Sequence, residues 1–141
     1  MLAAIIREAE KATDHSVHRV LDGALWTEHG RALCEAAVTL ARSAHAAAIV
    51  AVTEAGATAR MLAALRPRAT ILAATPSAYA ASRLSLVWGV TPVVTDVTTM
   101  PDVRDTLISR GLVPSGSVVV FLAVHAVLGR DDTNFVHAER I

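Results

Sequence analysis

Several residue types are scarce in this 141-residue chain, and each scarcity narrows what the protein can be. A single cysteine, Cys34, cannot form an internal disulfide, so nothing indicates a secreted, disulfide-stabilised protein. The 13 basic and 13 acidic side chains balance, which leaves no basic surplus for nucleic acid or an anionic membrane. The longest apolar runs are far shorter than the roughly 20 residues that span a bilayer.

The N-terminus also lacks the features of a signal peptide, because its first ten residues include acidic side chains and have helical spacing. We therefore expect a cytoplasmic location. With only 4% aromatic residues, aliphatic side chains must supply most of the core. A catalytic role for Cys34 is disfavoured because no base is placed beside it. The histidines are scattered and form no metal-ligand set with carboxylates or the cysteine: His15, His18, His29, His45, His125 and His137.

What the chain does contain is an alternation of apolar runs and amphipathic segments. Residues 1–26 predict an N-terminal helix and a polar linker, and residues 27–141 predict one α/β domain. Strands are predicted at residues 48–52, 70–74, 90–94, 117–123 and 135–140. Helices are predicted at residues 28–44, 57–66, 76–86 and 99–110.

Local signals refine these elements. Thr75 is expected to cap the helix that Pro76 begins, and Thr99 is expected to cap the helix that starts at Thr99-Met100-Pro101-Asp102. Pro92 predicts a strand near an edge, because proline cannot donate to a sheet ladder. Strands that alternate with helices indicate a parallel sheet with helices on both faces, a three-layer α/β/α architecture.

In such a sheet, ligands bind beyond the carboxyl ends of the strands. The loop after the first strand has two hydroxyls, Thr53 and Thr58, and a glycine, Gly56, before a helix N-terminus that favours anions. A phosphate site is one interpretation of this loop. A purely structural cap by Thr53 is the other, and the sequence does not decide between them.

Several segments, taken in order, resemble the C-terminal domain of pyruvate kinases. The resemblance rests on residues 1–10, 32–41, 48–60, 66–76, 86–93, 111–113 and 132–134. It implies an open, mostly parallel sheet with an antiparallel last strand, and a subunit interface within a homo-oligomer. It also implies a phosphorylated sugar or nucleotide effector. The effector residues it implies are Thr53, Glu54, Ala55, Gly56, Ala57, Thr58 and Arg130.

The chain departs from the family pattern at two loop positions. Ala55 replaces a serine whose hydroxyl holds phosphate in the family, and Ala57 stands where a basic residue is common. Each lost charge-assisted hydrogen bond is worth about 1.5–3 kcal/mol. In the loop of residues 125–132, the family's glycine-rich pattern is absent and Arg130 is the only cation.

The resemblance also places catalysis, with its Mg²⁺ and K⁺, in a barrel that this sequence does not contain. The only lysine, Lys11, does not lie in the barrel's Lys-Ile-Glu signature, so no catalysis and no cofactor are expected from this chain alone. Two alternatives stay open. One is a stand-alone protein that senses or acts on a phosphorylated metabolite, with Glu54 as acid or base. The other is pairing with a separate barrel chain through Ile5 and Ile6.

Overall fold

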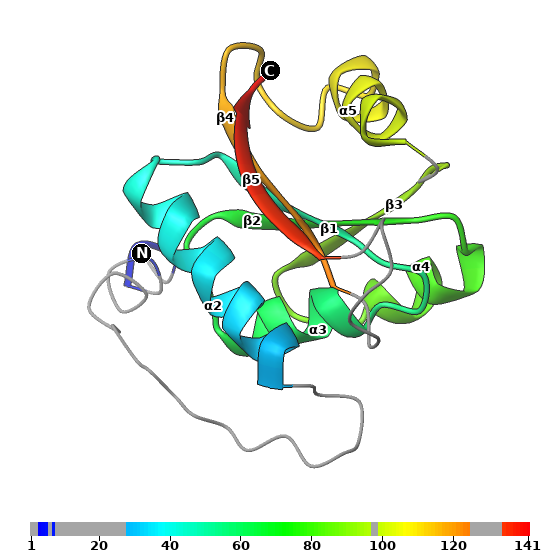
Figure 1. Ribbon diagram of the computed structural model, residues 1–141, viewed down its shortest axis with the longest axis horizontal. Helices are drawn as coiled ribbons and strands as arrows, with labels where there is room; N and C mark the ends of the chain where they lie inside the picture. The colour runs from blue at the N-terminus through cyan, green and yellow to red at the C-terminus, as the bar shows by residue number, and fades with distance from the viewer. Residues whose placement is uncertain (1–2, 6, 8–27, 97–98, 125–133) are drawn as a thin grey trace.

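The computed structural model describes residues 3–5, 7, 28–96, 99–124 and 134–141. From residue 28 onward, the described chain forms a five-stranded sheet covered by helices (Figure 1). Residues 3–5 and 7 are helical, and the rest of the predicted N-terminal helix and linker lies outside the described residues. The chain then runs through α2 (Glu28–Ser43), β1 (Ala48–Val52), α3 (Ala57–Ala64), β2 (Thr70–Thr75), α4 (Ala78–Leu84), β3 (Val90–Val94), α5 (Met100–Ser109), β4 (Val118–Ala123) and β5 (Phe135–Arg140).

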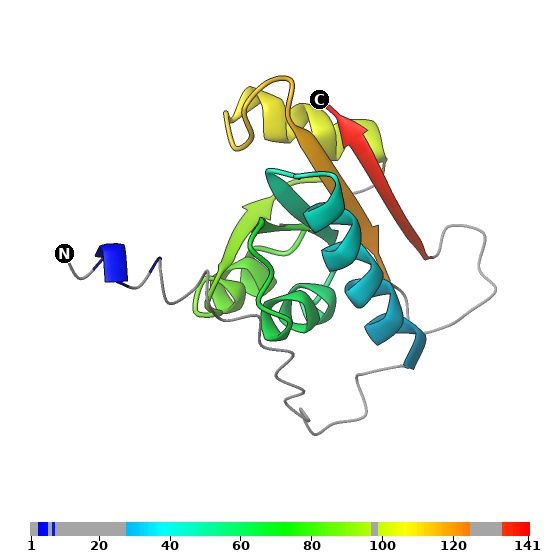
Figure 2. The same ribbon diagram turned by 90° about the vertical axis from the view of Figure 1, so that its left-hand side faces the viewer.

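The strand order in the sheet is β3-β2-β1-β4-β5. β1 pairs in parallel with both β2 and β4, and β2 pairs in parallel with β3. β5 runs antiparallel to β4. The predicted three-layer sheet, mostly parallel with an antiparallel last strand, is confirmed. Right-handed crossovers decide which face of the sheet each helix covers. The chain steps in one direction from β1 to β3 through α3 and α4, and then in the other direction from β3 to β4 through α5. α5 therefore lies on the face opposite α3 and α4 (Figure 2).

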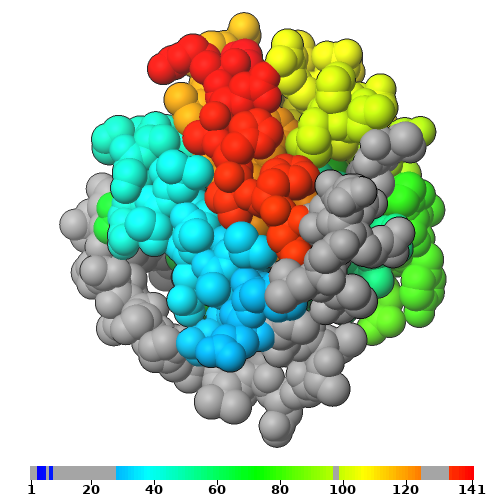
Figure 3. Space-filling view, in the orientation of Figure 1, coloured from blue at the N-terminus to red at the C-terminus, as the bar shows by residue number. Residues whose placement is uncertain are grey.

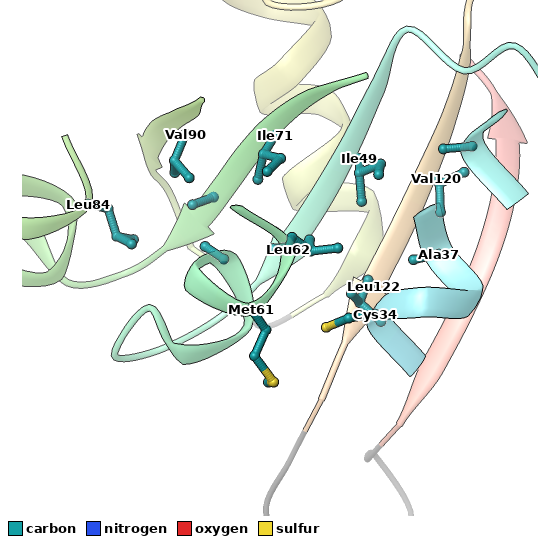
Figure 4. Packing of buried hydrophobic residues seen from close by; sticks show 14 residues of the cluster. Cys34, Ala37, Ile49, Met61, Leu62, Ile71, Leu84, Val90, Val120 and Leu122 are labelled. Atoms are coloured by element: carbon teal, nitrogen blue, oxygen red, sulfur yellow. The ribbon is translucent and has the colours of Figure 1, made fainter. Parts of the chain in front are cut away.

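Successive side chains of a strand point to opposite faces of the sheet, so the strands contribute residues to two separate cores. On one face, Ile49, Ile71, Val120 and Leu122 pack with buried side chains of α2, α3 and α4 (Figure 4). On the other face, strand residues such as Val50 and Phe121 pack against α5. β1 therefore has both of its faces buried, as its uninterrupted apolar sequence predicted.

The two edges of the sheet differ. β3 is an edge strand, as Pro92 predicted, and an Arg110 guanidinium nitrogen donates to the Val94 carbonyl at 2.9 Å. β5 forms the opposite edge and lies beside α2 on the molecular surface (Figure 3). None of the helices in the described part of the chain is long and apolar enough to cross a membrane.

One predicted helix start was wrong. Thr75 belongs to β2, because its carbonyl accepts from Thr95 N at 3.0 Å and the residue pairs with Val94. The cap of α4 is Ser77, whose Oγ accepts from Ala80 N at 3.1 Å. Thr99 caps α5 as predicted and accepts from Asp102 N at 3.3 Å. α3 and α4 end two residues before their predicted ends, at Ala64 and Leu84.

Candidate functional site

The strand order places a candidate site between the carboxyl ends of β1 and β4. The chain leaves β1 toward β2 on one side, and β4 enters the sheet on the other side of β1. Loops diverge at such a switch point, and ligands of open α/β sheets bind there. The loop after β1, residues 53–56, is described. The segment that follows β4 in sequence, residues 125–133, includes Arg130 and lies outside the described residues.

Thr53 holds the first loop closed on itself. Its backbone nitrogen donates to the Ala74 carbonyl at 2.9 Å, which continues the pairing of β1 with β2. Its Oγ1 accepts from the Gly56 backbone nitrogen at 2.9 Å, and the residue is buried. The hydroxyl still has a hydrogen to donate, because a threonine hydroxyl is one donor as well as an acceptor. Thr53 therefore closes the loop rather than capping α3, whose N-cap is Gly56, and its hydroxyl hydrogen is the donor that it can offer to a ligand.

Gly56 is the residue on which the loop turns into α3. Its φ is +92°, in the left-handed region that favours glycine. A Cβ at this position would lie 2.9 Å from Leu84 Cδ2 and 3.1 Å from Leu84 Cγ. Leu84 is fully buried at the end of α4, so the loop backbone rests directly on that helix. Both the conformation and the available space exclude larger residues here.

α3 begins directly after this loop, and the donors of its first turn have no acceptor within the helix. The first hydrogen bond onto the helix runs from Arg60 N to the Gly56 carbonyl, at 3.1 Å, and Gly56 has no side chain with which to cap. The N–H groups of the preceding turn, from Ala57 to Ala59, therefore have no helical acceptor. Thr58 lies in this turn and is buried. Such a turn carries a partial positive charge and suits an anion.

Thr75, the last residue of β2, makes a contact with this loop that the sequence reasoning missed. It is fully buried, its Oγ1 donates to the Glu54 carbonyl at 3.0 Å, and the same oxygen accepts from Ser77 N at 3.2 Å. It thereby ties the loop after β1 to the loop after β2. The available signal was a threonine at the same edge of the sheet in both places, Thr53 directly after β1 and Thr75 as the last residue of β2, and the expected capping role of Thr75 hid it.

The predicted effector residues of the first loop are thus contiguous in space, but they differ in accessibility. Glu54 and Ala55 are exposed, Ala57 is half-buried, and Thr53 and Thr58 are buried. With Ala55 and Ala57 in place, the loop itself presents no serine hydroxyl and no cation. A ligand would depend on the helix N-terminus and the two threonines.

Other candidate chemistry is not supported by the described residues. Burial raises the pKa of the Cys34 thiol to about 12, and the Glu35 carboxylate adds to the rise. The thiol is therefore protonated at neutral pH and is a poor nucleophile. In the part of the chain that the structure describes, no group of three or more His, Cys, Asp or Glu side chains could hold a metal ion.

Comparison with known proteins places this domain in context. The sequence matches the family described as "Pyruvate kinase, alpha/beta domain" over residues 31–137, from α2 into β5. It is 36% identical over 90 residues to pyruvate kinase of Clostridium acetobutylicum, covering 60% of this chain and 19% of that protein. It is 40% identical over 82 residues to pyruvate kinase of Staphylococcus aureus strain USA300, covering 54% and 14%.

Solved structures agree on the fold. One crystal structure of a pyruvate kinase from Cryptosporidium parvum superposes with a TM-score of 0.74 at 24% identity, covering 99% of this chain and 29% of that one. A second has a TM-score of 0.65 at 23% identity, covering 85% and 23%. The chain thus spans less than a third of these proteins and less than a fifth of the two bacterial relatives. Because the family match extends over most of its length, the chain belongs to the pyruvate kinase alpha/beta domain family.

Proposed function

We propose that this domain is a regulatory and assembly module of pyruvate kinase, which binds a phosphorylated effector at the loop of residues 53–58. The observation that carries the proposal is the N-terminus of α3 at the switch point of the sheet, with donors from Ala57 to Ala59 that have no helical acceptor. The Thr53 and Thr58 hydroxyls border the same turn. Family membership supports the assignment to pyruvate kinase.

The effector in this proposal is a phosphorylated sugar or nucleotide. A phosphate group matches a helix N-terminus in charge and in its number of acceptor oxygens. Since Thr53 Oγ1 already accepts from Gly56 N, the bound phosphate takes the hydroxyl hydrogen of Thr53 and the backbone donors of α3. Arg130, in the segment that follows β4 in sequence, would supply a cation. With no serine at position 55, we expect a weaker site than the family pattern would provide.

Assembly is the second part of the proposal. Family membership favours a homo-oligomer, and a catalytic barrel carried on a separate chain is a further partner to test. Sedimentation velocity over a wide concentration range tests self-association, and co-purification with a pyruvate kinase barrel tests the second contact. A chain that stays monomeric and does not retain a barrel would contradict this part.

Thermal unfolding with a ligand panel tests the effector site. We expect one of fructose 1,6-bisphosphate, glucose 6-phosphate, ribose 5-phosphate, AMP, ATP or inorganic phosphate to raise the melting temperature. A ligand at about 100 times its Kd adds roughly 2.7 kcal/mol to the free energy of unfolding, a shift of several degrees. Thr58→Val keeps the side-chain shape but removes the hydroxyl, so it should reduce the ligand-induced shift.

Thr91→Val provides the matched control, because Thr91 is exposed in the amino-terminal half of β3, away from the carboxyl edge of the sheet. Its ligand-induced shift should equal that of the unmodified chain. If no compound stabilises the protein, or if Thr58→Val and Thr53→Val both keep the full shift, the effector site is not at this loop.

A further inference from the structure

Arg60 is the only charged residue of α3, and it lies one turn inside the helix. Its backbone nitrogen donates to the Gly56 carbonyl at 3.1 Å, which is the first hydrogen bond of the helix. Its side chain is half-buried, and the residues that the structure describes give its guanidinium neither an ion pair nor a hydrogen bond. α3 therefore carries a cation that is available to an anion.

Helix geometry directs the Arg60 side chain toward the N-terminus of α3. Every Cα–Cβ bond of an α-helix tilts toward the N-terminus, so a side chain covers the residues three and four positions earlier. For Arg60 these residues are Ala57 and Gly56, which present one methyl group and no side chain. Neither of them separates the guanidinium from the N–H groups of the first turn, from Ala57 to Ala59.

The first turn also holds a hydroxyl without a partner. Thr58 is 2% exposed, and its Oγ1 forms no hydrogen bond within the described residues, although solvent still reaches that oxygen. A helical threonine often donates to the carbonyl four residues earlier. Here that carbonyl belongs to Glu54 and accepts instead from Thr75 Oγ1 at 3.0 Å. A buried side chain whose hydroxyl stays free beside donors without a helical acceptor indicates a binding position for a ligand.

Glu54 is the acidic residue nearest to Arg60 in the sequence, and it does not neutralise Arg60. Its side chain is exposed, and the ion pairs of the described chain include neither residue. The two charges therefore stay separate at the candidate site. Arg60 can attract a negative group of a ligand, whereas Glu54 repels any second negative group that lies over the loop.

We propose that Arg60 is the cation of the loop of residues 53–58, and that the loop binds a ligand with a single phosphate monoester. The inference rests on the proposed function above and adds a binding residue and a ligand class to it. The phosphate contacts the Arg60 guanidinium, the N–H groups of the first turn of α3 and the Thr58 hydroxyl. A guanidinium presents paired N–H donors that match two phosphate oxygens.

The charges of the site favour one phosphate over two. A phosphate monoester carries about 1.5–2 negative charges at neutral pH, and a helix N-terminus offers about half a positive charge in addition to the guanidinium. Within the described part of the loop, a second phosphate would meet only the Glu54 carboxylate. We therefore expect glucose 6-phosphate or AMP to bind more tightly than fructose 1,6-bisphosphate.

Calorimetric titration with these three compounds and with inorganic phosphate tests the assignment. Arg60→Met keeps the apolar stem but removes the charge, so the affinity for the monophosphate should fall about tenfold or more. Arg60→Lys keeps the charge without the paired donors and should give an intermediate affinity. Arg42→Met, in the exposed last turn of α2, should leave the affinity unchanged.

Salt dependence separates a direct contact from a structural role. The affinity of the unmodified chain for the monophosphate should fall as the ionic strength rises, and Arg60→Met should reduce the slope of this fall. Because the guanidinium has no partner in the described chain, Arg60→Met without ligand should unfold in urea at the midpoint of the unmodified protein.

The outcomes distinguish the role of Arg60 from the effector site itself. If a monophosphate binds and Thr58→Val weakens it, while Arg60→Met keeps the full affinity and salt dependence, the role of Arg60 is overturned and the effector site stands. If fructose 1,6-bisphosphate binds more tightly than both monophosphates, the preference for a single phosphate is overturned. If no compound binds, the effector site and the role of Arg60 are both overturned.

Discussion

Gly56→Ala is the substitution whose cost the structure predicts most directly. Gly56 and Gly116 both have positive φ, +92° and +81°. They differ in surroundings, because a Cβ at Gly56 meets Leu84 while a Cβ at Gly116 has open space. The pair therefore separates the penalty of backbone conformation from the penalty of the contact. Each variant should be measured by urea unfolding, with the midpoint and the slope fitted separately.

The magnitude follows from two contributions. A left-handed conformation costs an alanine about 1–2 kcal/mol, and the restricted unfolded chain returns about 0.4–1 kcal/mol. Gly116→Ala should thus lower the free energy of unfolding by roughly 1 kcal/mol or less. At Gly56, overpacking against the buried Leu84 adds about 1–3 kcal/mol. We therefore expect Gly56→Ala to lower the free energy of unfolding by about 1–4 kcal/mol.

A double-mutant cycle with Leu84→Ala tests the cause. Leu84→Ala leaves a cavity and should cost about 2–5 kcal/mol by itself. Combined with Gly56→Ala, the total should be clearly smaller than the sum, because the shortened side chain gives the new Cβ room. Equal costs for Gly56→Ala and Gly116→Ala, or strict additivity in the cycle, would refute the argument that the loop rests on Leu84.

Two further predictions concern buried groups. Thr75→Val removes the hydroxyl that joins Glu54 and Ser77, so it should destabilise the protein by about 1–3 kcal/mol in urea unfolding, while Thr75→Ser should largely retain the two hydrogen bonds. The pKa of Cys34 is raised from 9.0 to about 12 in the folded chain, so its contribution to stability is complete below about pH 9 and is lost as the pH rises toward 12. The free energy of unfolding should be lower at about pH 10 than at about pH 8, by up to about 1.4 kcal/mol per pH unit, and Cys34→Ala should lack this loss. Equal losses in both proteins would contradict the raised pKa.

Much of the fold could be predicted from local pattern. Uninterrupted apolar runs such as residues 48–52 indicate strands buried on both faces, and Pro92 indicates an edge, because each effect depends only on the residues themselves. The antiparallel direction of β5 followed from the family resemblance alone. The cap of α4 was misplaced because Thr75 and Ser77 carry the same local signal, and the pairing of Thr75 with β3 decided between them.

The candidate site was predictable only in outline. Its position after β1 follows from the alternation of strands and helices, together with Gly56 and the two threonines. The contacts that shape it join residues distant in sequence: Thr75 with the Glu54 carbonyl, and Gly56 with Leu84. No local pattern encodes such contacts, since they depend on how the helices settle on the finished sheet.

The unequal covering of the sheet has a consequence for how the protein opens. Three helices share the core on one face, whereas α5 covers the other face as the only described helix of that core. α5 can therefore detach while the core on the far side stays packed, as a separate cooperative unit. Its amide hydrogens should exchange with deuterium at a lower free energy than those of β1, which is sealed on both faces. Of these two elements, α5 should likewise be cleaved by a protease under native conditions before β1.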